Sequence, residues 1–115
     1  MRVIIAGSRN ITDLKVVAQA WEASKFNITE VVTGCARGVD TLAILVAKAH
    51  EVPVKRFPAD WLKHGRAAGI MRNIEMAKYA EALIAVWDGK SFGTKHMLKV
   101  AADMNLPLFI HRVES

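Results

Sequence analysis

The sequence predicts a single α/β domain in which helices cover both faces of a parallel sheet. Short apolar runs alternate with stretches of helical periodicity along the whole 115-residue chain. This alternation is typical of repeated strand–helix–strand units. Several of the apolar runs lead directly into a glycine-containing loop. The run Leu83–Trp87 is apolar throughout, as expected for a strand buried on both faces of a parallel sheet.

The first half of the chain contains three expected strands, which are Val3–Ala6, Glu30–Thr33 and Pro53–Phe57. Thr12 is the expected N-cap of the first helix, because a side-chain hydroxyl can accept a bond from the first turn. The second helix is expected to begin near Asp40 or Thr41. Both helices have apolar residues at the spacing of one buried face. These residues are Leu14, Val17, Ala18 and Trp21 in the first helix, and Leu42, Leu45, Val46 and Ala49 in the second.

The second half contains two more helices and two more strands. A helical region from about Gly65 to Tyr79 precedes the strand Leu83–Trp87, and the last strand is Leu106–Ile110. Thr94 is the expected N-cap of the final helix. The expected buried faces are Ile70, Ile74 and Ala77 in the third helical region, and Met97, Val100, Ala101 and Met104 in the last helix.

Five strands alternating with four helices predict a three-layer Rossmann-like domain with right-handed crossovers. The first and fourth strands are the expected central neighbours, because the connections must diverge to cover both faces, which gives the order 3-2-1-4-5. The loops Gly7–Arg9 and Asp88–Thr94 would then flank the point where the strand order reverses. Ligands bind at this point in open α/β sheets.

Length and composition indicate one domain over residues 1–115. The hydrophobic share of 52 % excludes a disordered chain. No apolar run approaches the roughly 18 residues of a membrane helix, and the first residues do not resemble a signal peptide, so we expect a cytoplasmic protein without a membrane partner. Cys35 is the only cysteine and the histidines lack ligand spacing, so we expect neither a disulfide nor a metal site.

The formal net charge is +5, and part of the excess lies in one segment. Five basic residues and one acid, Asp60, fall between Lys55 and Arg72. An anionic partner and an ordinary solvated basic face both account for this segment.

Three glycine-containing loops predict a phosphate-binding site, because each joins an expected strand to an expected helix. They are Gly7–Arg9, Gly34–Asp40 and Asp88–Thr94. Glycines allow close approach of a ligand, hydroxyls and guanidinium groups bind phosphate, and helix N-termini favour anions. Arg72 and Asn73, in the third helical region, are predicted to contribute a second cation and an amide. The predicted ligand-binding residues are Gly7, Ser8, Arg9, Gly34, Ala36, Arg37, Gly38, Asp40, Arg72, Asn73, Asp88, Gly89, Lys90, Ser91, Gly93 and Thr94.

Some roles within this set stay open. Asp40 either caps the second helix, which we favour, or holds Arg37. Trp87 is expected in the core, whereas Trp61 is equally suited to packing and to stacking on a base. His96, just after Thr94, either faces the site or lies on the surface, and we favour the surface position.

Two nucleotide-binding motifs are excluded. The segment Gly89-Lys90-Ser91 resembles the end of a P-loop, but Ile84 occupies the position of the required upstream glycine. The dinucleotide fingerprint is absent after the first strand, where the chain continues from Gly7 as Ser-Arg-Asn-Ile-Thr.

The combination of motifs resembles the SLOG superfamily, a Rossmann-like group that includes DNA-processing protein A, the LOG phosphoribohydrolases and the YpsA/YspA-type proteins. The similarity is greatest to the small YspA-like branch and covers nearly the whole chain. The segments that carry it are Gly7-Ser8-Arg9, Gly34 through Asp40, Pro58-Ala59-Asp60-Trp61, Ala68-Gly69, Arg72-Asn73, Met76, and Asp88-Gly89-Lys90-Ser91 with Gly93-Thr94.

The resemblance implies binding of a phosphorylated nucleotide or a nucleotide-derived ligand such as NAD, ADP-ribose or a nucleoside phosphate. Such a protein would act as a sensor or in a bacterial or phage conflict system, with no required cofactor. Relatives often pair through helices, so the resemblance also allows a homo-oligomer. The resemblance to DNA-processing protein A implies single-stranded DNA as an alternative partner.

An enzyme is a further alternative. LOG-type enzymes cleave the N-glycosidic bond of nucleotides with a glutamate in the motif P-G-G-x-G-T-x-x-E. Here Gly93-Thr94 matches the G-T pair, but Met97 stands at the glutamate position. A methionine cannot exchange protons, so a catalytic carboxylate would have to be Asp88 or Glu75, and we favour a binding protein.

Overall fold

The computed structural model describes residues 1–114 and contains one five-stranded sheet. All neighbouring strands are parallel and the order is β3-β2-β1-β4-β5, which confirms the predicted Rossmann-like fold and strand order. The strands are β1 (Arg2–Gly7), β2 (Glu30–Thr33), β3 (Val54–Arg56), β4 (Ala82–Trp87) and β5 (Leu108–Arg112). The helices are α1 (Leu14–Ser24), α2 (Val39–Ala49), α3 (Trp61–His64), the 3₁₀ turn η1 (Gly65–Ala67), α4 (Ala68–Tyr79) and α5 (Phe92–Asp103).

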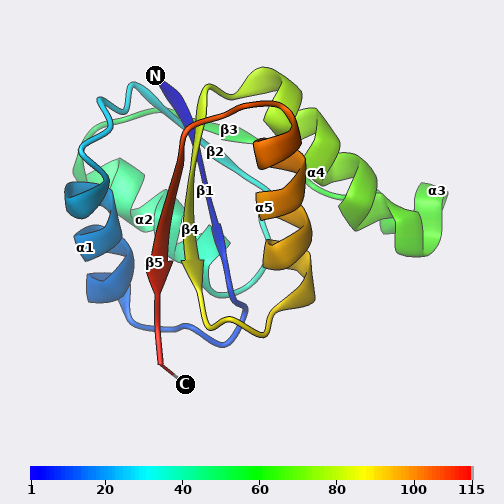
Figure 1. The fold of residues 1–115 in the computed structure, drawn as a ribbon, viewed down its shortest axis with the longest axis horizontal. Coiled ribbons are helices and arrows are strands. Elements are labelled where there is room, and N and C mark those ends of the chain that lie inside the picture. The colour runs from blue at the N-terminus through cyan, green and yellow to red at the C-terminus, as the bar shows by residue number, and fades with distance from the viewer. Residues whose placement is uncertain (115) are drawn as a thin grey trace.

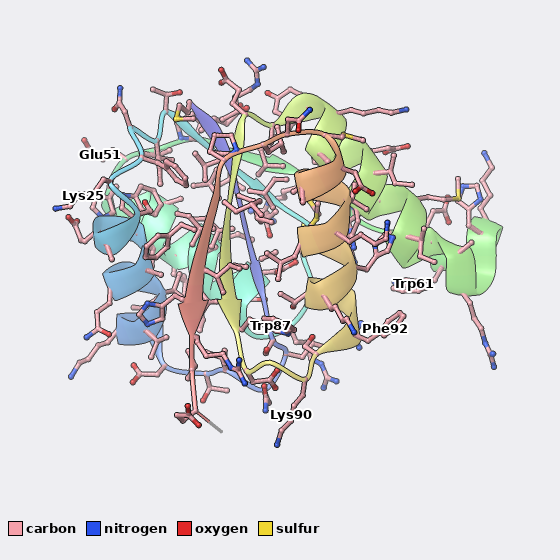
Figure 2. The ribbon with its side chains drawn as sticks, viewed as in Figure 1. Lys25, Glu51, Trp61, Trp87, Lys90 and Phe92 are labelled. Atoms are coloured by element: carbon pink, nitrogen blue, oxygen red, sulfur yellow. The ribbon has the colours of Figure 1, made fainter. Side chains whose placement is uncertain are left out.

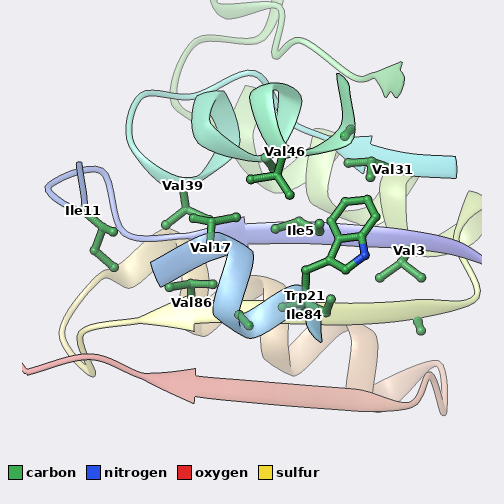
Figure 3. Close-up of a cluster of buried hydrophobic side chains, with 14 residues drawn as sticks. Val3, Ile5, Ile11, Val17, Trp21, Val31, Val39, Val46, Ile84 and Val86 are labelled. Atoms are coloured by element: carbon green, nitrogen blue, oxygen red, sulfur yellow. The ribbon is translucent and has the colours of Figure 1, made fainter. Parts of the chain in front are cut away.

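The sheet separates two hydrophobic clusters. Helices α1 and α2 cover one face and α4 and α5 cover the other (Figure 1). Because strand side chains alternate between faces, Val3 and Ile5 of β1 pack with Val17, Trp21 and other residues of the first cluster (Figure 3). Ile4 and Ala6 pack in the second cluster, which includes Met76 and Met97.

The predicted start and buried face of α2 differ from the observed ones. The helix begins at Val39, whose amide donates to the Ser8 carbonyl at 3.3 Å, and Gly38 is the N-cap. Leu45 is 50 % exposed instead of buried, and Ala49 is exposed as well. The buried residues are Val39, Asp40, Ala43, Val46 and Ala47. The segment is apolar around most of its circumference, so the sequence did not distinguish the two faces.

The predicted helical region from Gly65 to Tyr79 contains η1 and α4, and the short helix α3 that precedes it was not predicted. Asp60 caps the short helix α3 by accepting a bond from the Lys63 amide at 3.1 Å. Gly65 has a φ of +56°, which ends α3 and turns the chain through η1 into α4. In Figure 1, α3 lies beyond the end of α4, outside the two helical layers. On α4 the exposed fraction of Ile70 is 47 %, so its predicted inward position is wrong.

Two predicted helix caps are also wrong. Asp13, not Thr12, is the N-cap of α1, and its carboxylate accepts a bond from the Lys15 amide at 3.0 Å. Ser91, not Thr94, is the N-cap of α5, and Thr94 is buried in the first turn.

Within residues 1–114, none of the helices has both the length and the apolar character needed to cross a membrane.

Candidate functional site

A cavity of about 450 Å³ lies at the carboxyl edge of the sheet. Its walls come from the end of β1, the loop before α2, the α3–α4 segment and the start of α5. Many residues of the predicted ligand-binding set line this cavity. They are Gly7, Arg9, Ala36, Asp40, Arg72, Asn73, Ser91, Gly93 and Thr94.

A second cavity of about 280 Å³ adjoins the first. Gly34 and Arg37, also from the predicted set, line it. The two cavities share residues in their walls and are therefore adjacent, and together we call them the recess. The shared residues are Arg9, Ala36, Trp61 and Arg72.

Ser8 and Gly38 do not line either cavity but hold the loops behind them. Ser8 is 1 % exposed, and its hydroxyl accepts a bond from the Asp88 amide at 3.1 Å. Its carbonyl accepts the bond from Val39 described above. A Cβ atom on Gly38 would lie 2.4 Å from this same carbonyl oxygen. Ser8 therefore connects all three predicted loops.

The segment from Asp88 to Lys90 forms a turn directly before Ser91. The Asp88 carboxylate accepts bonds from the amides of Lys90 and Ser91 at 2.8 and 2.9 Å. These bonds hold the pKa of Asp88 below its usual range, with the bond from Lys90 the largest cause. Gly89 lies against the Arg112 guanidinium. Figure 2 shows the Lys90 side chain extending toward the bottom of the view. These three residues line neither cavity, so they shape the loop outside them.

Asp40 is the single carboxylate among the residues that line the two cavities. It is 5 % exposed, and Oδ2 accepts a bond from the Ala36 amide at 3.2 Å. Burial raises the pKa of Asp40 to about 6, against the opposing effects of the Ala36 bond and the charge of Arg72. The favoured capping role is wrong, because Gly38 is the N-cap of α2. Asp40 instead holds the preceding loop in place.

Arg72 connects α4 to the same loop. Its Nη1 donates to the Gly34 carbonyl at 2.5 Å, and its Nε donates to Asn73 Oδ1 at 3.1 Å. Burial lowers the pKa of Arg72 from its usual value, and the nearby charge of Asp40 opposes this effect. A Cβ on Gly34 would lie 2.4 Å from Arg72 Nη1, so a larger residue here would displace the guanidinium from its present position.

Asn73 continues the polar chain toward α5. It is 7 % exposed, and its Nδ2 lies 3.0 Å from His96 Nδ1 and 3.4 Å from the Gly93 carbonyl. His96 lines the larger cavity. Its predicted place on the open surface is therefore wrong.

The first turn of α5 faces the larger cavity. Phe92, Gly93 and Thr94 form this turn and all line the cavity. The N-cap Ser91 makes no side-chain cap bond, and its Oγ lies 3.2 Å from Thr94 Oγ1. The first amides of a helix lack partners within the helix. This turn can therefore donate to an anion.

Several lining residues lie outside the predicted ligand-binding set, and of these only Trp61 and His96 had been considered for the site. They are Trp61, Arg66, Gly69, Ile70, Met76, Phe92, His96 and Met97. Phe92 carries a signal that could have identified it, because a large apolar residue inside a glycine-rich loop has no core to enter. Trp87 is half-buried and its indole donates to the Ser91 carbonyl at 3.1 Å.

The predicted catalytic candidates Asp88 and Glu75 do not line either cavity. Met97, at the position of the LOG glutamate, is 1 % exposed and forms part of the cavity wall. Among residues 1–114 there is no cluster of three or more side chains that could hold a metal ion.

Comparison with known proteins gives three matches. The model of the YspA, cpYpsA-related SLOG family matches residues 1–64. Gene 61 protein of Mycobacterium phage D29 is 35 % identical over 120 residues, covering 93 % of each chain. The X-ray structure of DNA processing protein A (DprA) from Streptococcus pneumoniae superposes with a TM-score of 0.77 at 17 % identity. That match covers 95 % of this chain and 49 % of the other, so this chain spans about half the length of that protein, and the likeness concerns the fold.

Proposed function

Because the chain belongs to the YspA, cpYpsA-related SLOG family, we propose that residues 1–115 are one nucleotide-binding domain. The ligand is a phosphorylated nucleotide or a nucleotide-derived molecule, and it binds in the larger cavity. One observation carries the proposal: the first turn of α5 and the guanidinium groups of Arg9, Arg66 and Arg72 line the same recess. The volume of about 450 Å³ lies within the range of small-molecule sites.

The charges around the recess support an anionic ligand. Three arginines line the larger cavity against one carboxylate, Asp40, and burial favours the neutral form of that carboxylate. Helix N-termini and guanidinium groups both bind phosphate, the first through amides and the second through paired N–H groups. Gly93 has no atom within 4 Å of the position of a Cβ, so a phosphate can approach this turn closely.

The adjoining cavity supports a ligand with more than one anionic group. Arg9 and Arg72 line both cavities, and Arg37 adds a third cation to the smaller one. NAD, ADP-ribose and nucleoside polyphosphates all carry a linked pair of phosphates. A role as a sensor, or in a bacterial or phage conflict system, is consistent with the relative from a phage.

Nucleotide N-glycosidic cleavage is the alternative, and Asp40 is the observation that favours it. A carboxyl with a pKa of about 6 is suited to general acid or base catalysis near neutral pH. Against this, its Oδ2 is occupied by the Ala36 amide, and both Asp88 and Glu75 lie outside the cavities. Incubation with NAD and nucleoside monophosphates, followed by assay for free base, distinguishes the two functions. Turnover that is lost in Asp40→Asn, Asp88→Asn or Glu75→Gln would establish the enzyme.

The binding proposal is tested by a thermal-shift screen of NAD, ADP-ribose, nucleoside mono- and triphosphates and cyclic nucleotides. A ligand at 100 times its dissociation constant stabilises the protein by about 2.7 kcal/mol. We expect Gly93→Val to abolish the shift, because the new side chain would project from the first turn of α5 into the cavity. The melting temperature of the free protein should change little, since no neighbouring atom obstructs that side chain.

Ala102→Val is the matched control, because Ala102 lies on the same helix, is exposed and does not line the cavity. It should leave the ligand-induced shift intact. Unchanged affinity in Gly93→Val would contradict the placement of the phosphate. Arg72→Ala is a less specific test, because it also releases the Gly34 carbonyl.

A further inference from the structure

Two exposed aromatic rings lie at the opening of the larger cavity. Trp61 of α3 is 52 % exposed and Phe92, the first residue of α5, is 78 % exposed. Both line the cavity, and Figure 2 shows them on the side where α3 faces the start of α5. Neither ring belongs to the two hydrophobic clusters that stabilise the fold. Their exposure costs hydration free energy without a gain in core packing, which indicates a surface for a ligand.

The position of Trp61 depends on two neighbouring features. Asp60 caps α3 and so fixes the helix that carries the indole. A Cβ on Gly69 would lie 3.3 Å from Trp61 Cη2, so the missing side chain gives the indole room over the start of α4. The ring is therefore held at the wall shared by the two cavities, next to Arg72.

A chain of hydrogen bonds fixes the donor that His96 offers to the cavity. Arg72 Nε can only donate, so the Asn73 atom that faces it is the acceptor Oδ1. The other amide atom, Nδ2, then donates to His96 Nδ1 at 3.0 Å. Because Nδ1 accepts, the proton of the neutral imidazole is on Nε2. His96, which lines the cavity, therefore has a ring N–H donor at Nε2.

We propose that Trp61, Phe92 and His96 form the base-binding part of the nucleotide site. The two rings stack on the base, and His96 Nε2–H donates to a ring nitrogen or carbonyl oxygen on its edge. The phosphates then extend toward the arginines and the first turn of α5. This inference rests on the proposed function and adds that the ligand carries a nucleobase recognised by these side chains.

The experiment compares ligands with and without a base. Affinities for the four common ribonucleoside monophosphates and for ribose 5-phosphate are measured by calorimetry on the wild type and on Trp61→Ala, Phe92→Ala and His96→Phe. Removal of one stacking ring is expected to weaken binding of the best monophosphate about tenfold or more. The affinity for ribose 5-phosphate should not change. His96→Phe keeps an aromatic ring without the donor and should also weaken only the monophosphate.

Leu62→Ala is the matched control, because Leu62 is fully exposed beside Trp61 and does not line the cavity. It should leave both affinities unchanged. A constant ratio of the two affinities in the Trp61 and Phe92 variants would overturn the base-binding role and leave the phosphate site intact. Wild-type protein that binds neither these ligands nor any nucleotide of the thermal-shift screen would overturn the proposed function, and the inference with it.

Discussion

Asp40 is the residue at which the chemistry of the site and the stability of the fold are most directly linked. Burial raises its pKa from 3.8 in the unfolded chain to about 6 in the folded protein. Between these values the folded protein binds more protons than the unfolded chain. The free energy of unfolding therefore falls as the pH rises through this window and is level above it. The full loss is about 3 kcal/mol, from the difference between the two pKa values.

Asp40→Asn should remove this pH dependence, because the amide oxygen can still accept from Ala36 but does not titrate. Urea unfolding of both proteins between about pH 4 and pH 7 checks this. The stability of the variant relative to the wild type should increase with pH by up to about 3 kcal/mol. The other carboxylates contribute equally to both proteins and cancel in the difference. Parallel stability curves would mean that Asp40 titrates in the native state as it does in the unfolded chain.

Single residues were predicted best where the backbone alone determines their place. Gly7 ends β1, Arg9 lies in the loop that follows it, and Gly93 lies in the first turn of α5. The parallel fold therefore brings them to one edge, and all three line the cavity. Ser8 could not be assigned a role in this way. Its side chain lies behind the wall because the register of β1 and β4 aligns it with the Asp88 amide. That register depends on pairing between distant segments, which a local pattern does not encode.

At the scale of elements, the strands were more predictable than the helix ends. Glu30–Thr33 was predicted at its observed bounds, because a buried strand is a short apolar run between polar turns. The predicted helix starts differ from the observed ones where several neighbouring residues could serve as the N-cap, as Thr12 and Asp13 could. Helix α3 was missed because its four residues are too few to show a helical period.

The short helix α3 leads to a prediction that compares the two aspartate N-caps, Asp13 and Asp60. Asp13→Ala should lower the free energy of unfolding by about 1 kcal/mol, because α1 packs on the core through Val17 and Trp21. Asp60→Ala should change the global value much less, because α3 and η1 contain no buried residue. It should instead increase amide hydrogen exchange in residues 61–67. Denaturant titration and exchange measurements on both variants check this, and an equal loss of global stability would show that α3 unfolds with the rest of the domain.

At the scale of the whole molecule, the strand order followed from chain connectivity alone. Right-handed crossovers and two covered faces leave few arrangements for five alternating strands. The recess was harder to predict, because its third wall is the α3–η1 segment, whose path depends on a cap, a glycine and the indole of Trp61. The sequence therefore predicted the edge at which the site lies but not the side chains that close it.

The net charge of +5 leads to a prediction about nucleic acid. Lys55, Arg56, Lys63 and Arg66 are all exposed and form the basic segment expected from the sequence. The described cavity wall offers two exposed aromatic rings, Trp61 and Phe92, rather than a long row of them. We expect a single-stranded oligonucleotide to bind more weakly than the best small nucleotide, with a shallow salt dependence.

Fluorescence anisotropy over a range of salt concentrations measures this. Each phosphate neutralised on a single strand contributes about −0.7 to the slope of log affinity against log salt. Tight binding with a slope that corresponds to several neutralised phosphates would favour the DNA-binding alternative. This chain shares its fold with DNA processing protein A.

The α3–η1 segment, residues 61–67, supplies Trp61 and Arg66 to the recess and has no buried residue. Substitutions in this segment do not disturb core packing, whereas substitutions in β1, β4 and α5 do. Ligand preference could therefore diverge between family members through this segment while the sheet evolves slowly. For protein engineering, a library randomised over residues 61–67 would sample new specificities with few unfolded members.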